Sequence, residues 1–192
     1  MFLDLVKKNR SFRTYNASRA VTEEELCRMV ECARFTPAAG NRQFLRYRLC
    51  NTPQEMGLVL SAVKWAALLP DWEFPPKGHE PTACIVICHD TTVAEDVRIS
   101  AKDTGIAAQT ILLAAAEMGL GGCMIGSFDP RKIIPGLNIP AHLTPVLVIP
   151  LGEPDEKVVL EDVPADGNTA YYRDAEGTHH VPKRTMDELI VR

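Results

Sequence analysis

The 192-residue sequence has no long hydrophobic run, no block of basic residues and no internal repeat. Its first ten residues are partly apolar, but Asp4, Lys7 and Lys8 interrupt them, so neither a signal sequence nor a membrane span is expected. The 21 Lys and Arg residues are outnumbered by 25 Asp and Glu residues, which argues against a nucleic-acid partner. With 46% hydrophobic residues the chain can bury a core, and we expect one cytoplasmic domain over residues 1–192.

Cysteine pairs of the CxxC type are also missing. The six cysteines are scattered through apolar segments without a Cys/His cluster of ligand spacing, so we expect most of them to be reduced core residues. Cys84 and Cys88 lie four residues apart in a strand-like run and should face the same side of that strand. We therefore predict no metal ligand, and a Cys/His metal protein is kept as an alternative that metal analysis would test.

The glycine fingerprint of a dinucleotide-binding fold is absent as well. Glycines at 119, 121, 122 and 126 do not have the G-x-G-x-x-G spacing, and they follow a predicted helix instead of opening one. One interpretation is a helix C-cap, in which glycine supplies a positive φ. The other is a close approach of the backbone to a flat ring, which a glycine allows because it has no Cβ.

Helix signals are plentiful. Thr22 with Glu25, and Thr52 with Glu55, each form a capping box, in which the two side chains satisfy free N–H groups of the first helical turn. The apolar positions that follow keep helical spacing. Helices are predicted at residues 2–9, from 23 up to Pro37, from 53 to about 69, at about 93–118, near 130–134 and at 185–190.

Strands are predicted at residues 43–50, 82–89 and 143–151, with a small hairpin that joins 171–173 to 179–181 around Gly177. The stretch 70–81 is rich in Pro and Gly and holds Trp72 and Phe74, so we expect a surface excursion of the kind that forms lids. Together these signals predict one α+β unit, with a central sheet and helices packed around it.

Two short cationic motifs stand near the chain ends. Arg10-Ser11-Phe12-Arg13 places two guanidinium groups three residues apart with a hydroxyl between them, a set that can hold a dianionic phosphate. A solvated helix end explains the same residues equally well. Lys183 and Arg184 form the second cationic pair, which composition alone describes as a charged tail.

In order and spacing, these features resemble the FMN-dependent nitroreductase family of NAD(P)H:FMN oxidoreductase-like proteins. The resemblance rests on Arg-Ser-x-Arg near the start, an Asn-x-Gln loop after the second helix, a long apolar helix running into Gly-Leu-Gly-Gly-Cys-x-Ile-Gly, and a terminal Pro-Lys-Arg. It spans nearly the whole chain and is strongest at 10–13 and 106–126. It implies a nitroreductase-like α+β fold with a central, mostly antiparallel sheet flanked by helices, one FMN-binding domain over 1–192, and an interlocked homodimer.

The resemblance also implies which residues bind the cofactor. Arg10, Ser11 and Arg13 would hold the FMN phosphate and ribityl chain, and Lys183 with Arg184 would close on the phosphate from the tail.

Two further segments would reach the flavin ring. Gly121 and Gly122 would lie against the isoalloxazine edge. The loop that carries Asn41 and Gln43, with the backbone of Ala38 and Ala39, would come from the neighbouring subunit. This loop departs from the family at 38–40, where relatives often have serine, and at 44–45, where they often have Pro-Trp.

The activity implied is hydride transfer from NADH or NADPH through bound FMN to a small oxidised acceptor such as a nitroaromatic or a quinone, with ping-pong kinetics. No catalytic side chain is assigned, because the flavin supplies the chemistry. The alternatives are a flavin-binding protein without turnover and a specialised flavoenzyme on the same scaffold, such as a dehalogenase or a dehydrogenase. The physiological acceptor and the choice between NADH and NADPH are not assigned.

The remaining aromatic and histidine residues receive structural interpretations. His89 is expected to be a hydrogen-bonded strand residue, and His179 and His180 are expected to be hairpin residues. Three aromatics are predicted to lie in the core or at the dimer interface, with stacking on the acceptor as the alternative: Trp65, Trp72 and Phe74.

Overall fold

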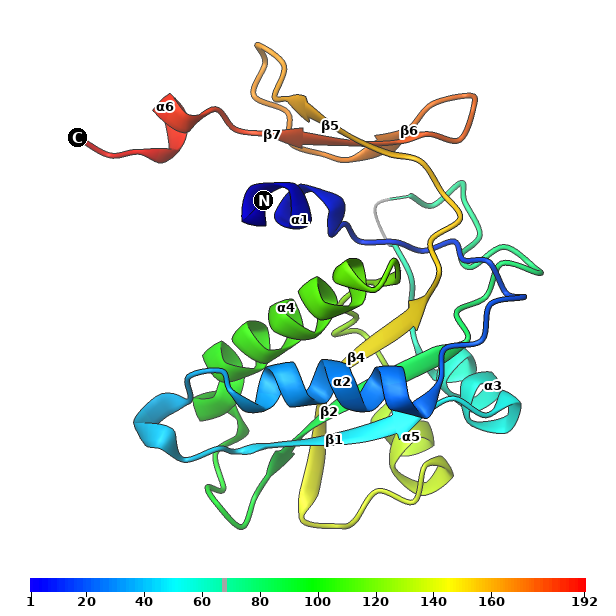
Figure 1. Ribbon diagram of the computed structural model, residues 1–192, viewed down its shortest axis with the longest axis vertical. Helices are drawn as coiled ribbons and strands as arrows, with labels where there is room; N and C mark the ends of the chain where they lie inside the picture. The colour runs from blue at the N-terminus through cyan, green and yellow to red at the C-terminus, as the bar shows by residue number, and fades with distance from the viewer. Residues whose placement is uncertain (67–68) are drawn as a thin grey trace.

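The computed structural model describes residues 1–66 and 69–192 (Figure 1). A four-stranded sheet lies at its centre with the strand order β1-β2-β4-β3, and every neighbouring pair is antiparallel. The strands are β1 (Leu45–Cys50), β2 (Ala83–Asp90), β3 (Gly121–Gly122) and β4 (Leu143–Gly152). The predicted central antiparallel sheet is confirmed, and β3 is an addition, because the glycine run was expected only as a helix end or a ring contact.

Helices cover both faces of this sheet. The first core cluster joins α2 and α4 to the face that carries Ile85 and Ile87, and the second joins α3 and α5 to the face that carries Cys84 and Cys88. The expectation that these two cysteines share one face is therefore confirmed. The helices are α1 (Phe2–Lys8), α2 (Glu23–Arg34), α3 (Pro53–Ala62), α4 (Ala101–Glu117), α5 (Pro130–Gly136) and α6 (Met186–Leu189), with single 3-10 turns η1 (Ala39–Asn41) and η2 (Val97–Ser100).

The two predicted capping boxes are confirmed. The Thr22 hydroxyl accepts a hydrogen bond from the Glu25 N–H at 3.2 Å, and the Thr52 hydroxyl accepts one from the Glu55 N–H at 3.3 Å. In each case the glutamate carboxylate accepts from the threonine N–H in return. Local sequence signals therefore set the starts of α2 and α3.

The end of α3 was predicted wrongly. The helix stops at Ala62 instead of about residue 69, because Val63 turns to extended backbone (φ -96, ψ 152) and forms a bridge with Phe128. The Lys64 N–H then donates to the Ser127 carbonyl at 2.9 Å. A partner more than sixty residues away ends this helix, and residues 67–68 of the predicted span lie outside the described residues.

The long helix was also predicted to begin too early. It starts at Ala101 instead of about residue 93, and the segment before it is the turn η2, in which the Arg98 N–H donates to the Asp96 carboxylate. From Asp103 onward one side of α4 is buried, in a core cluster shared with α2 and the sheet. Figure 1 shows α4 alongside α2. The prediction of a buried central helix is therefore confirmed for the second half of the predicted span.

Four of the six cysteines are buried, which confirms that most of them are core residues, whereas Cys27 and Cys32 are exposed on α2. Burial raises the pKa of Cys50 and Cys123 to about 12 and that of Cys88 to about 11. These buried thiols are consequently protonated at neutral pH and unreactive.

A second sheet forms the end of the chain, and we call it the C-terminal sheet. Its order is β5-β7-β6, with β5 (Val158–Asp162) parallel to β7 (His179–Lys183) and β6 (Tyr172–Arg173) antiparallel to β7. The predicted hairpin around Gly177 and the helical turn at α6 are confirmed, whereas β5 was missed. Figure 1 shows this sheet and α1 together at one end of the molecule. Among the described residues, no helix is long and apolar enough to cross a membrane.

Candidate functional site

The N-terminal cationic motif lies directly beside the glycine strand. Ser11 forms a parallel bridge with Gly122, and the Phe12 N–H donates to the Gly122 carbonyl at 3.1 Å. A Cβ added at Gly121 would collide with the Phe12 ring, and one added at Gly122 would collide with the Pro150 carbonyl. Glycine is thus required here for packing within the protein, and any contact of 121–122 with a ligand would involve backbone groups.

The two arginines of the motif have unused hydrogen-bonding capacity. Arg10 is half-buried, which lowers the pKa of its guanidinium, and its Nη2 donates to the Val6 carbonyl at 2.7 Å. Its Nε is buried without a partner among the described residues. In that part of the chain neither Arg10 nor Arg13 pairs with a carboxylate. Two guanidinium groups without an acidic partner, beside the exposed Ser11, fit a phosphate group.

Among the described residues, no hydrogen bond or ion pair joins the cations of the tail to this motif. Lys183 ends β7, and Arg184 forms an exposed ion pair with Glu188 at 3.1 Å. The residue of β7 that does contact Arg13 is His179, four positions earlier. At about 3.3 Å per strand residue, Lys183 lies roughly 13 Å farther along. The structure therefore brings the two chain ends together through the start of β7, and the assignment of Lys183 and Arg184 to a phosphate stays a prediction.

A buried ion pair connects the cationic motif to the C-terminal sheet. Glu156 accepts hydrogen bonds from the N–H groups of Arg13 and Thr14, the second at 3.0 Å, and forms an ion pair with Arg173. Only 2% of the Glu156 side chain and 6% of the Arg173 side chain are exposed. Nothing in the sequence identified this pair, because both residues stand in a polar tail.

Trp72 and Phe74 both contact Arg173. Their rings flank the Arg173 guanidinium, with centroids 5.3 Å and 4.8 Å from its Cζ, in a cation–π arrangement. Trp72 is 40% exposed, so a core position is wrong for it, whereas Trp65 packs against the second core cluster. The excursion 70–81 is consequently held against the C-terminal sheet.

His180 joins the strands of the C-terminal sheet. Its Nδ1 lies 3.0 Å from the Glu161 carboxylate and its Nε2 lies 3.0 Å from the Asp174 carboxylate, and its ring stacks on Tyr172 at 4.7 Å. Hydrogen bonds to the two carboxylates raise the pKa of His180 above its ordinary 6.5. The imidazolium form therefore ties β7 to β5 and to the turn after β6.

The contacts of His180 with Glu161 and Asp174, which we call the His180 clamp, predict that stability depends on pH. Because the pKa is raised on folding, the stabilisation by His180 is complete below pH 6.5 and is lost as the pH rises through the raised pKa. We expect the difference in Tm between the wild type and His180→Gln to shrink from about pH 6 to about pH 9. Thermal unfolding of both proteins across this range measures it, and a difference that does not change with pH would contradict the clamp.

His89 has the structural role that was predicted. Its Nδ1 and the Ser100 hydroxyl are 2.8 Å apart, and its Nε2 is 2.6 Å from the Ala94 carbonyl oxygen. Both ring nitrogens are therefore engaged, and the residue holds the segment before α4 against the end of β2. Among the described residues, no three His, Cys, Asp or Glu side chains are grouped so that they could hold a metal ion.

The loop expected to reach a flavin lies at the start of α4. The Ala39 N–H donates to the buried Asp103 carboxylate at 3.1 Å, and both Asn41 and Gln43 have a positive φ of 52°. Asp103 is a positioning residue that the sequence analysis missed. Its sequence signal is an acidic residue in the first turn of a helix whose second half is largely apolar.

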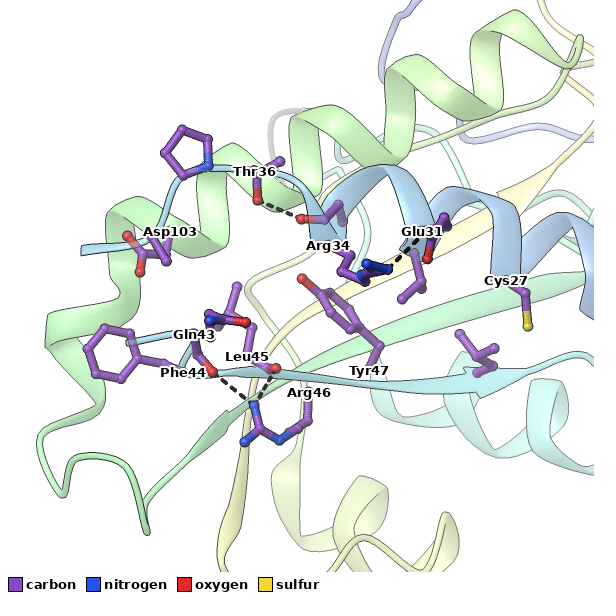
Figure 2. A pocket seen from close by; sticks show the side chains of 15 residues that line it. Cys27, Glu31, Arg34, Thr36, Gln43, Phe44, Leu45, Arg46, Tyr47 and Asp103 are labelled. Atoms are coloured by element: carbon purple, nitrogen blue, oxygen red, sulfur yellow. Dashed lines mark hydrogen bonds and ion pairs between the residues drawn. The ribbon is translucent and has the colours of Figure 1, made fainter. Parts of the chain in front are cut away.

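Ala38 and Gln43 border a groove of about 400 Å³ between α2 and the edge strand β1 (Figure 2). Apolar side chains from both elements line it, and Figure 2 shows the Tyr47 ring between them. The arginines at its rim are already engaged, since Arg34 pairs with Glu31 at 3.1 Å and Arg46 pairs with Asp90 at 2.8 Å. This groove is therefore unsuited to a phosphate.

The cationic motif and the loop lie at opposite ends of α4. The loop contacts Asp103 in its first turn, whereas Ser11 and Phe12 contact Gly122, five residues after its end (Figure 1). A helix of 17 residues is about 25 Å long at 1.5 Å per residue. Within one chain the two segments are therefore at opposite ends of this helix.

Comparison with known proteins shows the family of this chain. A family model described as the nitroreductase family matches residues 6–153. This chain belongs to the nitroreductase family. The match ends just before the C-terminal sheet, so Glu156, Arg173 and β5 to β7 lie outside the part that the family model describes.

Individual family members show how far the similarity extends. A protein of Methanothermobacter thermautotrophicus, named as an NADH dehydrogenase/NAD(P)H nitroreductase, is 28% identical over 165 residues, which are 84% of this chain and 81% of that protein. A nitroreductase family protein of Streptococcus pneumoniae has a TM-score of 0.71 at 18% identity and covers 100% of both chains. An FMN-dependent nitroreductase of Clostridium difficile has a TM-score of 0.64 at 22% identity, covering 81% of this chain and 88% of that one. The nitroreductase-like fold is therefore confirmed.

Proposed function

We propose that this protein is an FMN-dependent oxidoreductase that uses NADH or NADPH to reduce a small oxidised acceptor. The observation that carries the proposal is the pair of guanidinium groups of Arg10 and Arg13, which have no acidic partner among residues 1–66 and 69–192 and lie on a segment bridged to Gly122. Membership of the nitroreductase family and relatives named as NAD(P)H nitroreductases support it. Bound FMN would supply the chemistry, which is acceptance of a hydride from the nicotinamide and its transfer to the acceptor.

The residues of this chain would bind and orient the cofactor. We assign the phosphate and the ribityl chain to Arg10, Ser11 and Arg13, with Lys183 and Arg184 approaching from the tail. The backbone at 121–122 would lie along the ring edge, where its N–H and C=O groups can reach the polar atoms of the flavin. No side chain is assigned to proton transfer.

The binding site would be completed by a second subunit. Because the loop of Ala38, Ala39, Asn41 and Gln43 and the cationic motif lie at opposite ends of α4, a helix about 25 Å long, a two-fold partner would supply the loop to each flavin. The outward side of α4 is suited to such an interface, because Ile106 is 41% exposed and a Cβ added at Gly105 would point into open space. We therefore propose a homodimer with FMN at the subunit interface, in which residues 1–192 act as one FMN-binding unit.

The acceptor class and the kinetic scheme follow from an open flavin face. A nitroaromatic, a quinone or a similar flat electrophile could occupy the place that the nicotinamide leaves, which gives ping-pong kinetics. Initial rates at several acceptor concentrations should therefore give parallel lines in a double-reciprocal plot.

The decisive experiment is reduction of the FMN-loaded protein. Under anaerobic conditions, NADH or NADPH should bleach the flavin absorbance near about 450 nm, and an oxidised acceptor should restore it. Absence of bleaching with both nucleotides would instead identify a flavin-binding protein without turnover. A preparation that binds no FMN would overturn the proposal itself.

A further inference from the structure

Two residues of the C-terminal part of the chain, Tyr171 beside β6 and His179 of β7, contact the Arg13 side chain, and we call this pair the seat. The Arg13 guanidinium lies over the Tyr171 ring, with its Cζ 5.1 Å from the ring centroid. Its Nη1 lies 3.5 Å from Nε2 of His179 and 3.2 Å from the Ser11 carbonyl oxygen. The Tyr171 and His179 rings contact each other at 5.2 Å with a tilt of 55°, so they form one aromatic corner.

The backbone of Arg13 is fixed by the same part of the chain. Glu156, at the start of the C-terminal segment, accepts the N–H groups of Arg13 and Thr14. The carboxylate is itself held by Arg173. Both the main chain and the side chain of Arg13 are therefore oriented by residues that follow position 153, beyond the span of the family model.

The protonation state of His179 suits this contact. The residue is 2% exposed, and its burial, together with the charges of Arg13, Arg173 and His180, lowers its pKa to about 4. At neutral pH the ring is uncharged, so its Nε2 can present a lone pair to the guanidinium without charge repulsion. His180, the next residue, points to two carboxylates instead and has a raised pKa.

We propose that Tyr171, His179 and Glu156 are positioning residues that hold Arg13 in the orientation needed to bind the flavin cofactor. An arginine side chain has many rotamers, and ordering it in advance removes a cost that cofactor binding would otherwise meet. The inference rests on the proposed function, in that Arg13 must contact FMN. It goes further because it gives residues of the C-terminal sheet an effect on cofactor binding. They would exert this effect through Arg13 and not through contact with the cofactor.

The test compares two tyrosine–histidine pairs that stand side by side in the sequence. Tyr171→Leu and His179→Leu remove the seat. Tyr172→Leu is the matched control, because Tyr172 stacks on His180 in the same sheet, whereas Arg13 lies over the Tyr171 ring. Dissociation constants for FMN are measured by titration of the full-length, flavin-free proteins, with Tm recorded for each.

We expect each seat variant to weaken FMN binding by roughly fivefold to tenfold, and Tyr172→Leu to leave it unchanged. The conservative variant Tyr171→Phe should bind FMN with wild-type affinity, because its phenyl ring can still make the cation–π contact with Arg13. In a protein that already carries Arg13→Ala, the seat variants should have no further effect, since a seat without an arginine positions nothing.

The outcomes separate this inference from the proposed function. If Arg13→Ala weakens FMN binding while the seat variants do not, or if the losses add fully in the double variants, the seat is refuted and the FMN site stands. An equal loss in Tyr172→Leu would show a general effect of the sheet and would also refute it. If Arg13→Ala leaves FMN affinity intact, the assignment of Arg13 to the cofactor fails, and the seat fails with it.

Discussion

Replacement of both Arg10 and Arg13 by alanine is expected to lower the affinity for FMN by on the order of 100-fold or more and to leave the fold intact. Each guanidinium can make charge-assisted hydrogen bonds to a phosphate, and these are about twice as strong as neutral ones. Neither arginine is engaged by a carboxylate among the described residues, so the loss should fall on ligand binding and not on an internal ion pair. Flavin fluorescence during titration, with gel filtration of the same samples, measures affinity and assembly together.

The matched control for this prediction is Arg98→Ala with Arg131→Ala. Both arginines are exposed and each pairs with an aspartate two residues away, so their removal changes the net charge equally without touching the site. The control protein should bind FMN like the wild type. Stoichiometric FMN in the purified double variant of Arg10 and Arg13 would argue against the phosphate assignment.

Glu156→Gln is expected to lower the free energy of unfolding by about 3–5 kcal/mol, because it leaves the buried Arg173 guanidinium without a counter-charge. The glutamine oxygen can still accept the Thr14 N–H, so the substitution isolates the charge from the backbone contact. Denaturant unfolding of the flavin-free protein measures the change. Since whole domains are stable by about 5–15 kcal/mol, this single carboxylate would account for a large share of the total.

Two further variants make this result specific. Asp96→Asn breaks an ion pair of the same kind whose partners are 55% and 90% exposed, and no measurable change is expected there. Combining Glu156→Gln with Arg173→Met removes both charges and keeps a side chain between Trp72 and Phe74, so most of the lost stability should return. A Glu156→Gln protein as stable as the wild type would show that water, and not Glu156, solvates Arg173.

Much of the candidate site was readable in the sequence because its parts are short and contiguous. Arg10-Ser11-Phe12-Arg13 and Gly121-Gly122 each fit within one turn or one short strand, and the structure brings the two segments into direct contact. The sequence did not predict which residues from distant parts of the chain contact these two segments. Glu156 and Arg13 are 143 residues apart and His179 and Arg13 are 166 apart, and no local pattern marks such pairs.

The sequence by itself determined the elements whose signals are local: the starts of α2 and α3 at Thr22 and Thr52, the buried strand β2, and the hairpin around Gly177. Tertiary structure alone decided where α3 ends and that Val158–Asp162 pairs in parallel with β7. It also decided which end of α4 each predicted site segment occupies. The physical reason is that caps and alternation depend on neighbours a few residues away, whereas a bridge such as that of Val63 and Phe128 gains its hydrogen bonds only after the chain has folded back on itself.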